Sequence, residues 1–276
     1  MTIDTHVHIV APDRQRYPRK LDPENSGWVL DMSGETMLQL MSEAGIDRAM
    51  LVQAYTAYEY DNNYVADVAR MWPDRFVSVC ILDPTRFDAA DQLTYWVEER
   101  GVRGLRLFPA GEREALWLDD PRTFPLWERA GKLGIPVCVC LRFRQLPRLL
   151  AALERHPQVR VALDHLGAPR LEDGPPYEST APLFELTRLP NVYLKFSSVN
   201  LYGAAKGRST PREFFNRLLQ AFGSHRIMWG SNFPNTYDRS LKDQLANRLD
   251  ELSFVPEADR RWLFSETALS LWPILG

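Results

Sequence analysis

The sequence predicts a single (β/α)8 barrel, the α/β fold also known as the TIM barrel. Three observations lead to this prediction. The chain has 276 residues, slightly above the usual size of one such barrel. Short apolar runs rich in β-branched residues recur eight times along it, and helical patterns separate most of them. Because strands that alternate with helices form a parallel sheet, and eight repeats close that sheet, we expect residues 1–276 to form one barrel domain.

The predicted strands are nearly continuous apolar runs, which is typical of strands buried on both faces. They are TIDTHVHIV (2–10), RAMLVQAY (48–55), RFVSVCIL (75–82), VRGLRLF (102–108), IPVCVCL (135–141), VRVALDHLG (159–167), VYLKFSSV (192–199) and RIMWGSNF (226–233). The clearest helix is 33–45, with Ser33 as its candidate N-cap and Gly45 at its end. Further helices are expected at 64–72, 88–101, 123–134, 146–156, 181–189 and 211–223.

Four segments are too long and too polar or proline-rich to be simple connections. They are residues 10–32, 109–122, 168–180 and 200–210. Each follows a predicted strand, so each belongs to the C-terminal face of the barrel. Loops on that face form the active site and its lid, and we expect substrate specificity to reside in them.

Composition narrows the classes of partner. Hydrophobic residues make up 45% of the chain and charged residues 25%, and the formal net charge is −3. This balance gives no indication of nucleic acid or an anionic membrane as a partner, and favours a small-molecule substrate. A homo-oligomer remains open: tryptophans such as Trp28, Trp96, Trp127 and Trp262 suit an interface or a core equally well.

The predicted location is the cytoplasm. Three cysteines, Cys80, Cys138 and Cys140, lie in apolar runs without a disulfide or zinc-knuckle spacing, as expected for buried thiols in a reducing compartment. The start MTIDTHVHIV lacks the basic region of a secretory signal, and no stretch approaches the ~20 apolar residues of a membrane helix.

The first predicted strand carries a candidate catalytic pair. Asp4, His6 and His8 alternate along it, and alternation places them on one face, with Thr5 and Val7 on the other. Two imidazoles directed into a barrel near the C-terminal end of a strand form a metal clamp or an anion site. A His-x-His pair alone would mean little, but its place on the first of eight strands makes it a site candidate.

Two further residues end other strands. His165 ends the sixth strand in LDHLG, and Asn232 ends the eighth in MWGSNFP, which neighbours the first strand in a closed barrel. Taken alone, His165 could be a hydrogen-bonded core histidine, and Asn232 could cap the turn before Pro234. Together with His6 and His8, they predict four side chains converging on one barrel mouth.

The full-length pattern resembles the amidohydrolase superfamily, in the branch of 2-pyrone-4,6-dicarboxylate lactonase and related sugar-lactone hydrolases. The matching stretches run in order from IDTHVH through DNNYVADVARMWPDRFVSVCILDP, GVRGLRLF, LDHLG, LPNVYLKFSS and RIMWGSNFP to SETALSLW. The resemblance implies an amidohydrolase-type barrel in which His6, His8 and His165 surround the scissile carbonyl. It also implies a carboxylate at position 232, within a Gly-Ser-Asp motif followed by an aromatic residue and Pro.

Position 232 departs from the family pattern, because it is Asn in this chain. A carboxylate can take a proton from water, whereas a neutral amide cannot. Two explanations are open. Either the chain is an engineered variant whose turnover has been stopped, or the natural protein has Asn and performs different chemistry or none. The intact family pattern around the position favours the first.

A second departure concerns metal ligands. Metal-rich amidohydrolases carry a Lys or Glu on the fourth strand and a His on the fifth, whereas these strands read GLRLF and VCVCLRF here. His6 and His8, with position 232, make a thin set for zinc, which in catalytic sites normally has three protein ligands and a water. We therefore expect no obligatory cofactor, with one divalent ion such as zinc, held by His6 and His8, as the alternative.

Five residues are candidate substrate contacts. Arg106 and Arg142 stand at or near the C-terminal ends of the fourth and fifth strands, where an inward arginine would bind a substrate carboxylate; either could instead turn to solvent or pair with a lid carboxylate. Gln53 and Tyr55 follow the second strand and could contact substrate hydroxyls or brace the loop. Tyr202 could close over a ligand or simply pack within its loop.

The function that follows is hydrolysis of a lactone or related cyclic ester, with water activated by the residue at position 232. Three alternatives stay open: a metal-dependent decarboxylase or hydrolase of the same superfamily, a lactone isomerase, and a catalytically inactive barrel that binds a ligand.

Overall fold

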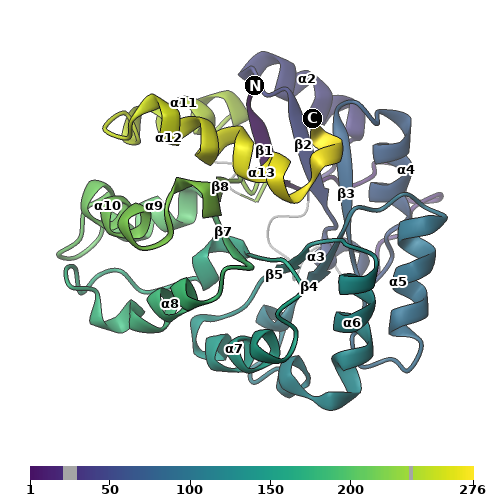
Figure 1. Ribbon diagram of the computed structural model, residues 1–276. Helices are drawn as coiled ribbons and strands as arrows, with labels where there is room; N and C mark the ends of the chain where they lie inside the picture. The colour runs from purple at the N-terminus through teal and green to yellow at the C-terminus, as the bar shows by residue number, and fades with distance from the viewer. Residues whose placement is uncertain (21–29, 236–238) are drawn as a thin grey trace.

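Eight parallel strands form a single sheet in which each strand pairs with the next along the chain (Figure 1). The structure is a computed structural model that describes residues 1–20, 30–235 and 239–276. The strands are β1 (Ile3–Val7), β2 (Arg48–Val52), β3 (Phe76–Ile81), β4 (Gly104–Leu107), β5 (Val137–Val139), β6 (Val161–Leu163), β7 (Val192–Phe196) and β8 (Ile227–Trp229). All eight lie within the predicted runs, and the predicted barrel is confirmed.

The barrel closes between its first and last strands just beyond β8. The N–H of His8 donates to the carbonyl oxygen of Phe233 at 2.8 Å, and the N–H of Asn232 donates to that of His6 at 2.8 Å. Gly230 allows this approach, because a Cβ at that position would lie 2.6 Å from Cβ of His6. Closure and the histidine pair therefore share the same short stretch of backbone.

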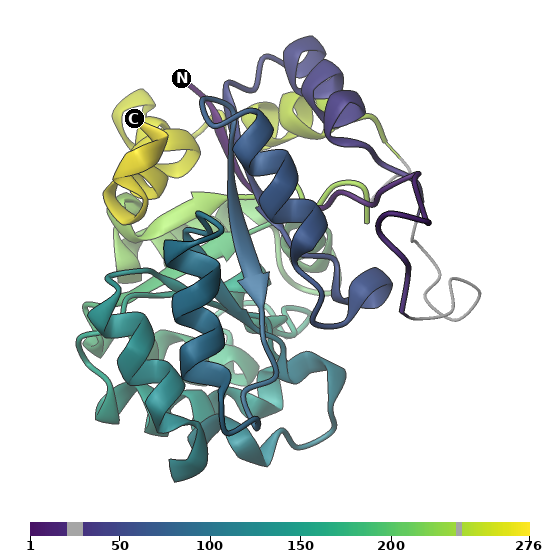
Figure 2. The same cartoon turned by 90° about the vertical axis from the view of Figure 1, so that its right-hand side faces the viewer.

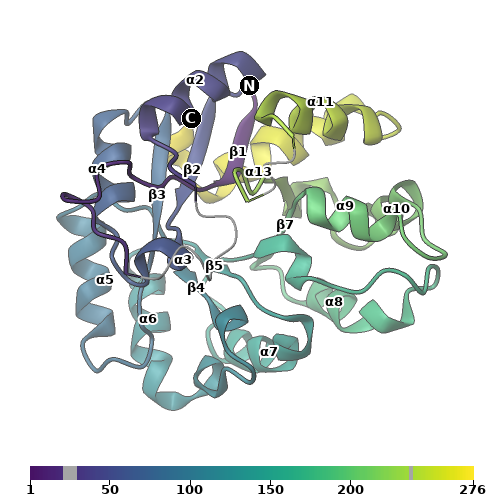
Figure 3. The same cartoon turned by 180° about the vertical axis from the view of Figure 1, so that it is seen from behind.

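Helices surround the strands, as Figures 1 and 3 show. They are α2 (Gly34–Ala44), α3 (Tyr55–Tyr58), α4 (Asn63–Met71), α5 (Ala89–Glu98), α6 (Phe124–Lys132), α7 (Leu146–Arg155), α8 (Ala181–Glu185), α9 (Ser198–Ala204), α10 (Pro211–Phe222), α11 (Leu241–Glu251), α12 (Glu257–Arg261) and α13 (Thr267–Leu271). In the part of the chain that the structure describes, no helix is both long and apolar enough to cross a membrane.

The helix α2 shows why the ends of a helix could be predicted from its capping residues. Oγ of Ser33 accepts a hydrogen bond from the N–H of Thr36, and Gly45 ends the helix at φ 73°, a left-handed conformation that glycine adopts without strain. Met37 and Met41, four residues apart, bury the inner face. The predicted helix 181–189 is shorter than expected, because α8 ends at Glu185 and a 3-10 turn follows.

Two predictions about loops were incomplete. The segment 200–210 was expected to be irregular, yet α9 extends into it to Ala204, and 109–122 contains short 3-10 turns. Part of the predicted loop 10–32, and Trp28 with it, lies outside the described residues. Trp96 and Trp127 are buried, so neither is available for an oligomer interface.

The interior of the barrel is apolar at its N-terminal end. Ile3, Met50, Val77 and Met228 pack there against Trp272 and other residues of the C-terminal segment. Figure 2 shows that both chain termini lie at this end of the molecule. The polar side chains of the interior therefore gather toward the opposite end, where the active sites of such barrels lie.

Candidate active site

A cavity of about 280 Å³ opens at the C-terminal ends of the strands. Its lining residues are His8, Tyr55, Thr56, Arg106, Phe108, Ala110, Cys140, His165, Ala168, Val199, Asn232 and Asn235. The structure thus brings together five of the residues that the sequence singled out. The volume lies at the small end of ligand pockets, which suits a small molecule.

The ring of His6 lies close to the rings of both His8 and His165. Its ring centroid lies 4.9 Å from that of His8 and 4.8 Å from that of His165. Nε2 of His6 lies 3.2 Å from Nε2 of His8, and both residues are buried. The predicted convergence of three histidines is therefore present, with His8 and His165 lining the cavity and His6 behind them.

Backbone contacts fix the tautomer of His8. Its Nδ1 lies 2.8 Å from the carbonyl oxygen of Val52, which can only accept a hydrogen bond, so Nδ1 carries the proton of the neutral ring. In the 3.2 Å contact between the two Nε2 atoms, Nε2 of His6 is therefore the donor and Nε2 of His8 is the acceptor. This leaves Nδ1 of His6 without a hydrogen bond, facing Oδ1 of Asp164 at 3.5 Å.

Asp164 holds the buried cations of the site together. Its Oδ2 accepts a hydrogen bond from Nε of Arg106 at 3.1 Å, and its Oδ1 lies 3.3 Å from Nζ of Lys195. Lys195 also donates to the carbonyl oxygen of Thr5 at 3.1 Å. Burial alone would raise the pKa of Asp164, but Lys195, His6 and Arg106 outweigh burial and hold it well below its usual range. Asp164 is therefore a carboxylate at neutral pH.

Sequence analysis did not single out Asp164. The signal was an acidic residue within an otherwise apolar predicted strand, directly before the candidate His165. A buried carboxylate needs a cationic partner, and that requirement would have linked it to Arg106.

Asp4, on β1, has a structural role: it accepts hydrogen bonds from the N–H groups of His6 and Ser231, at 3.0 and 2.9 Å.

The imidazoles are neutral at physiological pH. Burial lowers the pKa of His8 to about 3 and that of His165 to about 4. Burial likewise lowers the pKa of His6 far below its usual value, although Asp164 opposes the shift. A neutral imidazole has one N–H donor, and those of His8 and His6 already face the Val52 carbonyl and His8, so His165 is the ring of the three that can direct an N–H to a substrate oxygen.

Three of the cavity residues, His165, Ala168 and Asn232, have left-handed backbone conformations. His165 has φ 53° and Asn232 has φ 61°, in the left-handed region that few non-glycine residues occupy. Such conformations cost about 1 kcal/mol or more each and cluster at functional sites. Asn232, only 4% exposed, lines the cavity, and its backbone N–H takes part in closing the barrel.

Three predicted substrate contacts lie away from the cavity lining. Nε2 of Gln53 donates to the carbonyl oxygens of Glu59 and Asp61. Gln53 therefore braces the loop after β2, the second of the two roles predicted for it. Arg142 is exposed in a neighbouring hollow, and its Nε donates to the carbonyl oxygen of Ala110. Tyr202 packs under the guanidinium groups of two arginines.

His6 and His8 are the residues that could hold a metal ion, through the two facing Nε2 atoms. A catalytic zinc site normally has three protein ligands. Within residues 1–20, 30–235 and 239–276, no group of three or more His, Cys, Asp or Glu side chains is arranged to hold a metal ion. His6 and His8 alone fall short of the usual set of three zinc ligands.

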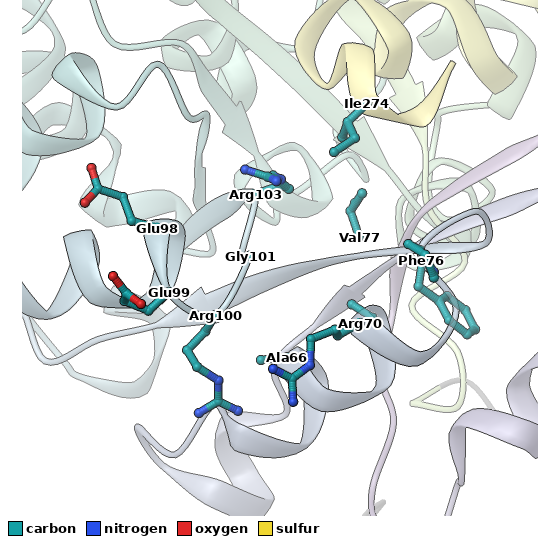
Figure 4. Close-up of a pocket in the computed structure, with 12 residues that line it drawn as sticks. Ala66, Arg70, Phe76, Val77, Glu98, Glu99, Arg100, Gly101, Arg103 and Ile274 are labelled. Atoms are coloured by element: carbon teal, nitrogen blue, oxygen red, sulfur yellow. The ribbon is translucent and has the colours of Figure 1, made fainter.

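A second hollow, of about 380 Å³, lies at the opposite end of the barrel (Figure 4). It is lined by the end of α4, the start of β3 and the segment after α5, which carries Arg100 and Arg103. Arg100 is already engaged by Asn63 and Asp67, at 2.8 Å each. The hollow also lacks the histidines, so we place the candidate active site at the C-terminal cavity.

Two curated proteins of related sequence are named as lactone hydrolases. L-fucono-1,5-lactonase of Burkholderia ambifaria is 26% identical over 238 residues, covering 84% of this chain and 80% of that protein. 4-Sulfomuconolactone hydrolase of Hydrogenophaga intermedia is 24% identical over 269 residues, covering 94% and 84%.

Solved structures share the barrel. An amidohydrolase from Burkholderia multivorans, crystallised with bound HEPES and with bound zinc, superposes with TM-scores of 0.80 and 0.78 at 22% identity, over 99% of both chains. The model of the amidohydrolase family matches residues 3–274, nearly the whole sequence. The chain therefore belongs to the amidohydrolase family.

Proposed function

We propose that the cavity hydrolyses a lactone, or a closely related cyclic ester, of a small carboxylated or sugar-derived molecule. The observation that carries the proposal is the convergence of His8, His165, Arg106 and position 232 on one small cavity. Relatives named as lactone hydrolases support the reaction class. The aromatic rings of Tyr55 and Phe108, with centroids 5.1 Å apart, provide an apolar wall against which a ring could lie.

In the proposed mechanism, a carboxylate at position 232 takes a proton from water, and the hydroxide attacks the lactone carbonyl. Nε2–H of His165, the ring whose Nδ1 is engaged by Ser197, donates a hydrogen bond to the developing oxyanion in a site shielded from bulk water, while His6 and His8 hold the surrounding geometry. The protonated acid then returns its proton to the leaving alkoxide. Arg106, held at Nε by Asp164, directs its remaining N–H groups to a polar or anionic group of the substrate.

Asn232 removes the first step, because a neutral amide cannot accept that proton. The chain with Asn232 is thus proposed to bind the lactone without efficient turnover, whether the residue is engineered or natural. This same observation favours the second candidate function, a barrel that binds its ligand and does not transform it.

The test is an assay of the Asn232→Asp variant on a panel of sugar and dicarboxylate lactones, with products identified by mass. Hydrolysis adds one water to the substrate mass, isomerisation leaves the mass unchanged, and decarboxylation removes carbon dioxide. A product that gains water supports the proposal. An unchanged or lighter product, or no product from any lactone, would reject it in favour of the corresponding alternative.

A further inference from the structure

We propose that Ser197 and Asn200, at the start of α9, position His165 so that its Nε2 edge faces the cavity. The chemical role of His165 rests on the proposed function, but the claim that Ser197 and Asn200 hold its ring and backbone in place can be tested without an activity assay. Neither residue is among the site candidates predicted from the sequence.

The turn that carries His165 needs external support. His165, Leu166, Gly167 and Ala168 have φ values of 53°, 55°, 72° and 53°, so four successive residues are left-handed and three of them have a Cβ. Such a run is unfavourable for L-amino acids and persists only where the surroundings hold it. The question is therefore which groups hold this turn.

Asn200 holds the backbone of the turn. Its Nδ2 donates to the carbonyl oxygen of His165 at 2.8 Å, and its Oδ1 accepts from the N–H of Ser197 at 3.0 Å. Asn200 is 3% exposed, so both hydrogen bonds are protected from water. One amide group thus ties the end of β7 to the turn that follows β6.

Ser197 holds the ring. Its Oγ lies 2.9 Å from Nδ1 of His165, and the serine is 1% exposed. With Nδ1 engaged, Nε2 is the nitrogen left for the cavity that His165 lines. Ser197 does not line the cavity, so it cannot reach a substrate carbonyl as a nucleophile. It is a positioning residue that acts through His165.

The chain supplies a matched control in the next residue. Ser198 is also 1% exposed, but its Oγ faces Oε1 of Gln244 at 3.5 Å and not a histidine. Removing either hydroxyl deletes one buried oxygen from the same turn of α9. Only the loss of the Ser197 hydroxyl should release the ring of His165.

The experiment compares Ser197→Ala with Ser198→Ala, each placed in the Asn232→Asp chain. For Ser197→Ala we expect kcat to fall about 10- to 100-fold with KM within about twofold, since a misplaced group costs rate more than binding. Ser198→Ala should stay within about twofold in both constants. Equal losses in the two variants, or a change in KM alone, would overturn the positioning role.

Crystal structures of the same variants give a readout that needs no activity. We expect the His165 ring to rotate or lose order in Ser197→Ala and to keep its place in Ser198→Ala. An unmoved ring in Ser197→Ala would overturn the inference even if lactone hydrolysis is demonstrated. Conversely, a displaced ring would uphold it even if no lactone is turned over, in which case only the proposed function fails.

Should Ser197→Ala fail to fold, Asn200→Asp removes the side-chain donor to the carbonyl oxygen of His165 and keeps the acceptor for the Ser197 N–H. The N–H of Ala168 donates to that same carbonyl at 2.9 Å. We expect faster amide exchange at Ala168 in Asn200→Asp than in the parent chain. An unchanged exchange rate would contradict the positioning role.

Discussion

Asp164 sets the charge balance of the barrel interior. It is the carboxylate that faces both Arg106 and Lys195, and all three side chains are almost completely buried. Of these three, Arg106 lines the cavity, and its positive charge favours a substrate oxygen that carries or develops negative charge.

Replacing Asp164 with Asn should destabilise the protein strongly. The variant leaves Arg106 and Lys195 buried without a counter-charge, for which we expect a loss of about 3–5 kcal/mol in the free energy of unfolding. Urea denaturation measures it. The control is Asp91→Asn, whose exposed pair with Arg129 should be worth less than about 1 kcal/mol. A similar small loss at both positions would show that the interior charges are not coupled.

The histidines predict how stability depends on pH. His8 and His165 have pKa values of about 3 and about 4 in the folded protein, below the ordinary value of 6.5. The unfolded chain therefore binds protons first, and stability falls as pH drops from about 6.5 toward 4. Burial raises the pKa of Asp4 to about 6, which opposes this trend over part of the range because the folded state then takes up a proton more readily.

These two imidazoles and His6, whose pKa burial also lowers, outweigh one carboxyl, so we expect the free energy of unfolding to fall by at least roughly 2 kcal/mol between pH 7 and pH 5. Denaturation curves at the two pH values measure the change. In the variant His165→Gln the same pH step should cost less, because one group has been removed. A variant that keeps the full pH dependence would show that His165 is not a source of it.

At the scale of elements, the junction between β8 and β1 leaves no room for a side chain at position 230. A methyl group on Gly230 would meet Cβ of His6 at 2.6 Å and N of His6 at 3.1 Å. Both strands carry site residues directly beyond this point, so a shift here moves His6, His8 and position 232 together.

We expect Gly230→Ala to cost roughly 1–3 kcal/mol of stability, as overpacking usually does, and to reduce activity further by displacing His6. Gly203→Ala in α9 is the control, since its added Cβ would meet only Leu171, at 3.8 Å. Thermal unfolding of both variants decides the matter. Equal melting temperatures for the two variants would show that the junction tolerates the methyl group.

The elements with local end signals were predictable. Ser33 and Gly45 delimit α2 in the sequence and in the structure, and each predicted strand contains an observed one. The helix α9 was missed because its first residues continue the apolar run of β7, and because the hydrogen bond from Nδ2 of Asn200 to the carbonyl oxygen of His165 joins it to a distant part of the chain. A pattern along the chain does not contain such contacts.

The site was predictable to the same degree. Residues on strand ends, such as His8 and His165, follow from the register of a parallel barrel. Arg142 was a poorer candidate because the direction of a side chain in a loop after a strand depends on tertiary contacts, here with Ala110. Asp164 acquires its role from β4 and β7, which only the closed barrel brings beside it.

At the scale of the whole molecule, the barrel interior is divided between a packed apolar end and a polar end that holds the cavity. Residues from β1, β4 and β7, with Asp164 beyond β6, meet in one buried network directly beneath that cavity. Such a network fixes the geometry of the site before substrate arrives, which is the condition for electrostatic stabilisation of a transition state.

The proposed mechanism predicts that hydrolysis does not depend on metal. After dialysis against a chelator, the Asn232→Asp variant should keep its kcat/KM within about twofold, because the carboxylate at position 232 takes the proton from water directly. Metal analysis before and after dialysis verifies removal. Loss of activity on dialysis, with recovery on adding zinc, would favour the metal-dependent alternative.

The most direct test of the central claim compares kcat/KM for lactone hydrolysis in three chains: the sequence as given, Asn232→Asp and Asn235→Asp. Asn235 lines the same cavity, so its variant adds an equal charge at a different place. We predict that Asn232→Asp exceeds both others by at least ~10²-fold, the usual contribution of a positioned general base. Equal rates for the two aspartate variants, or for Asn232→Asp and the unsubstituted chain, would contradict the assignment of position 232 as the proton acceptor.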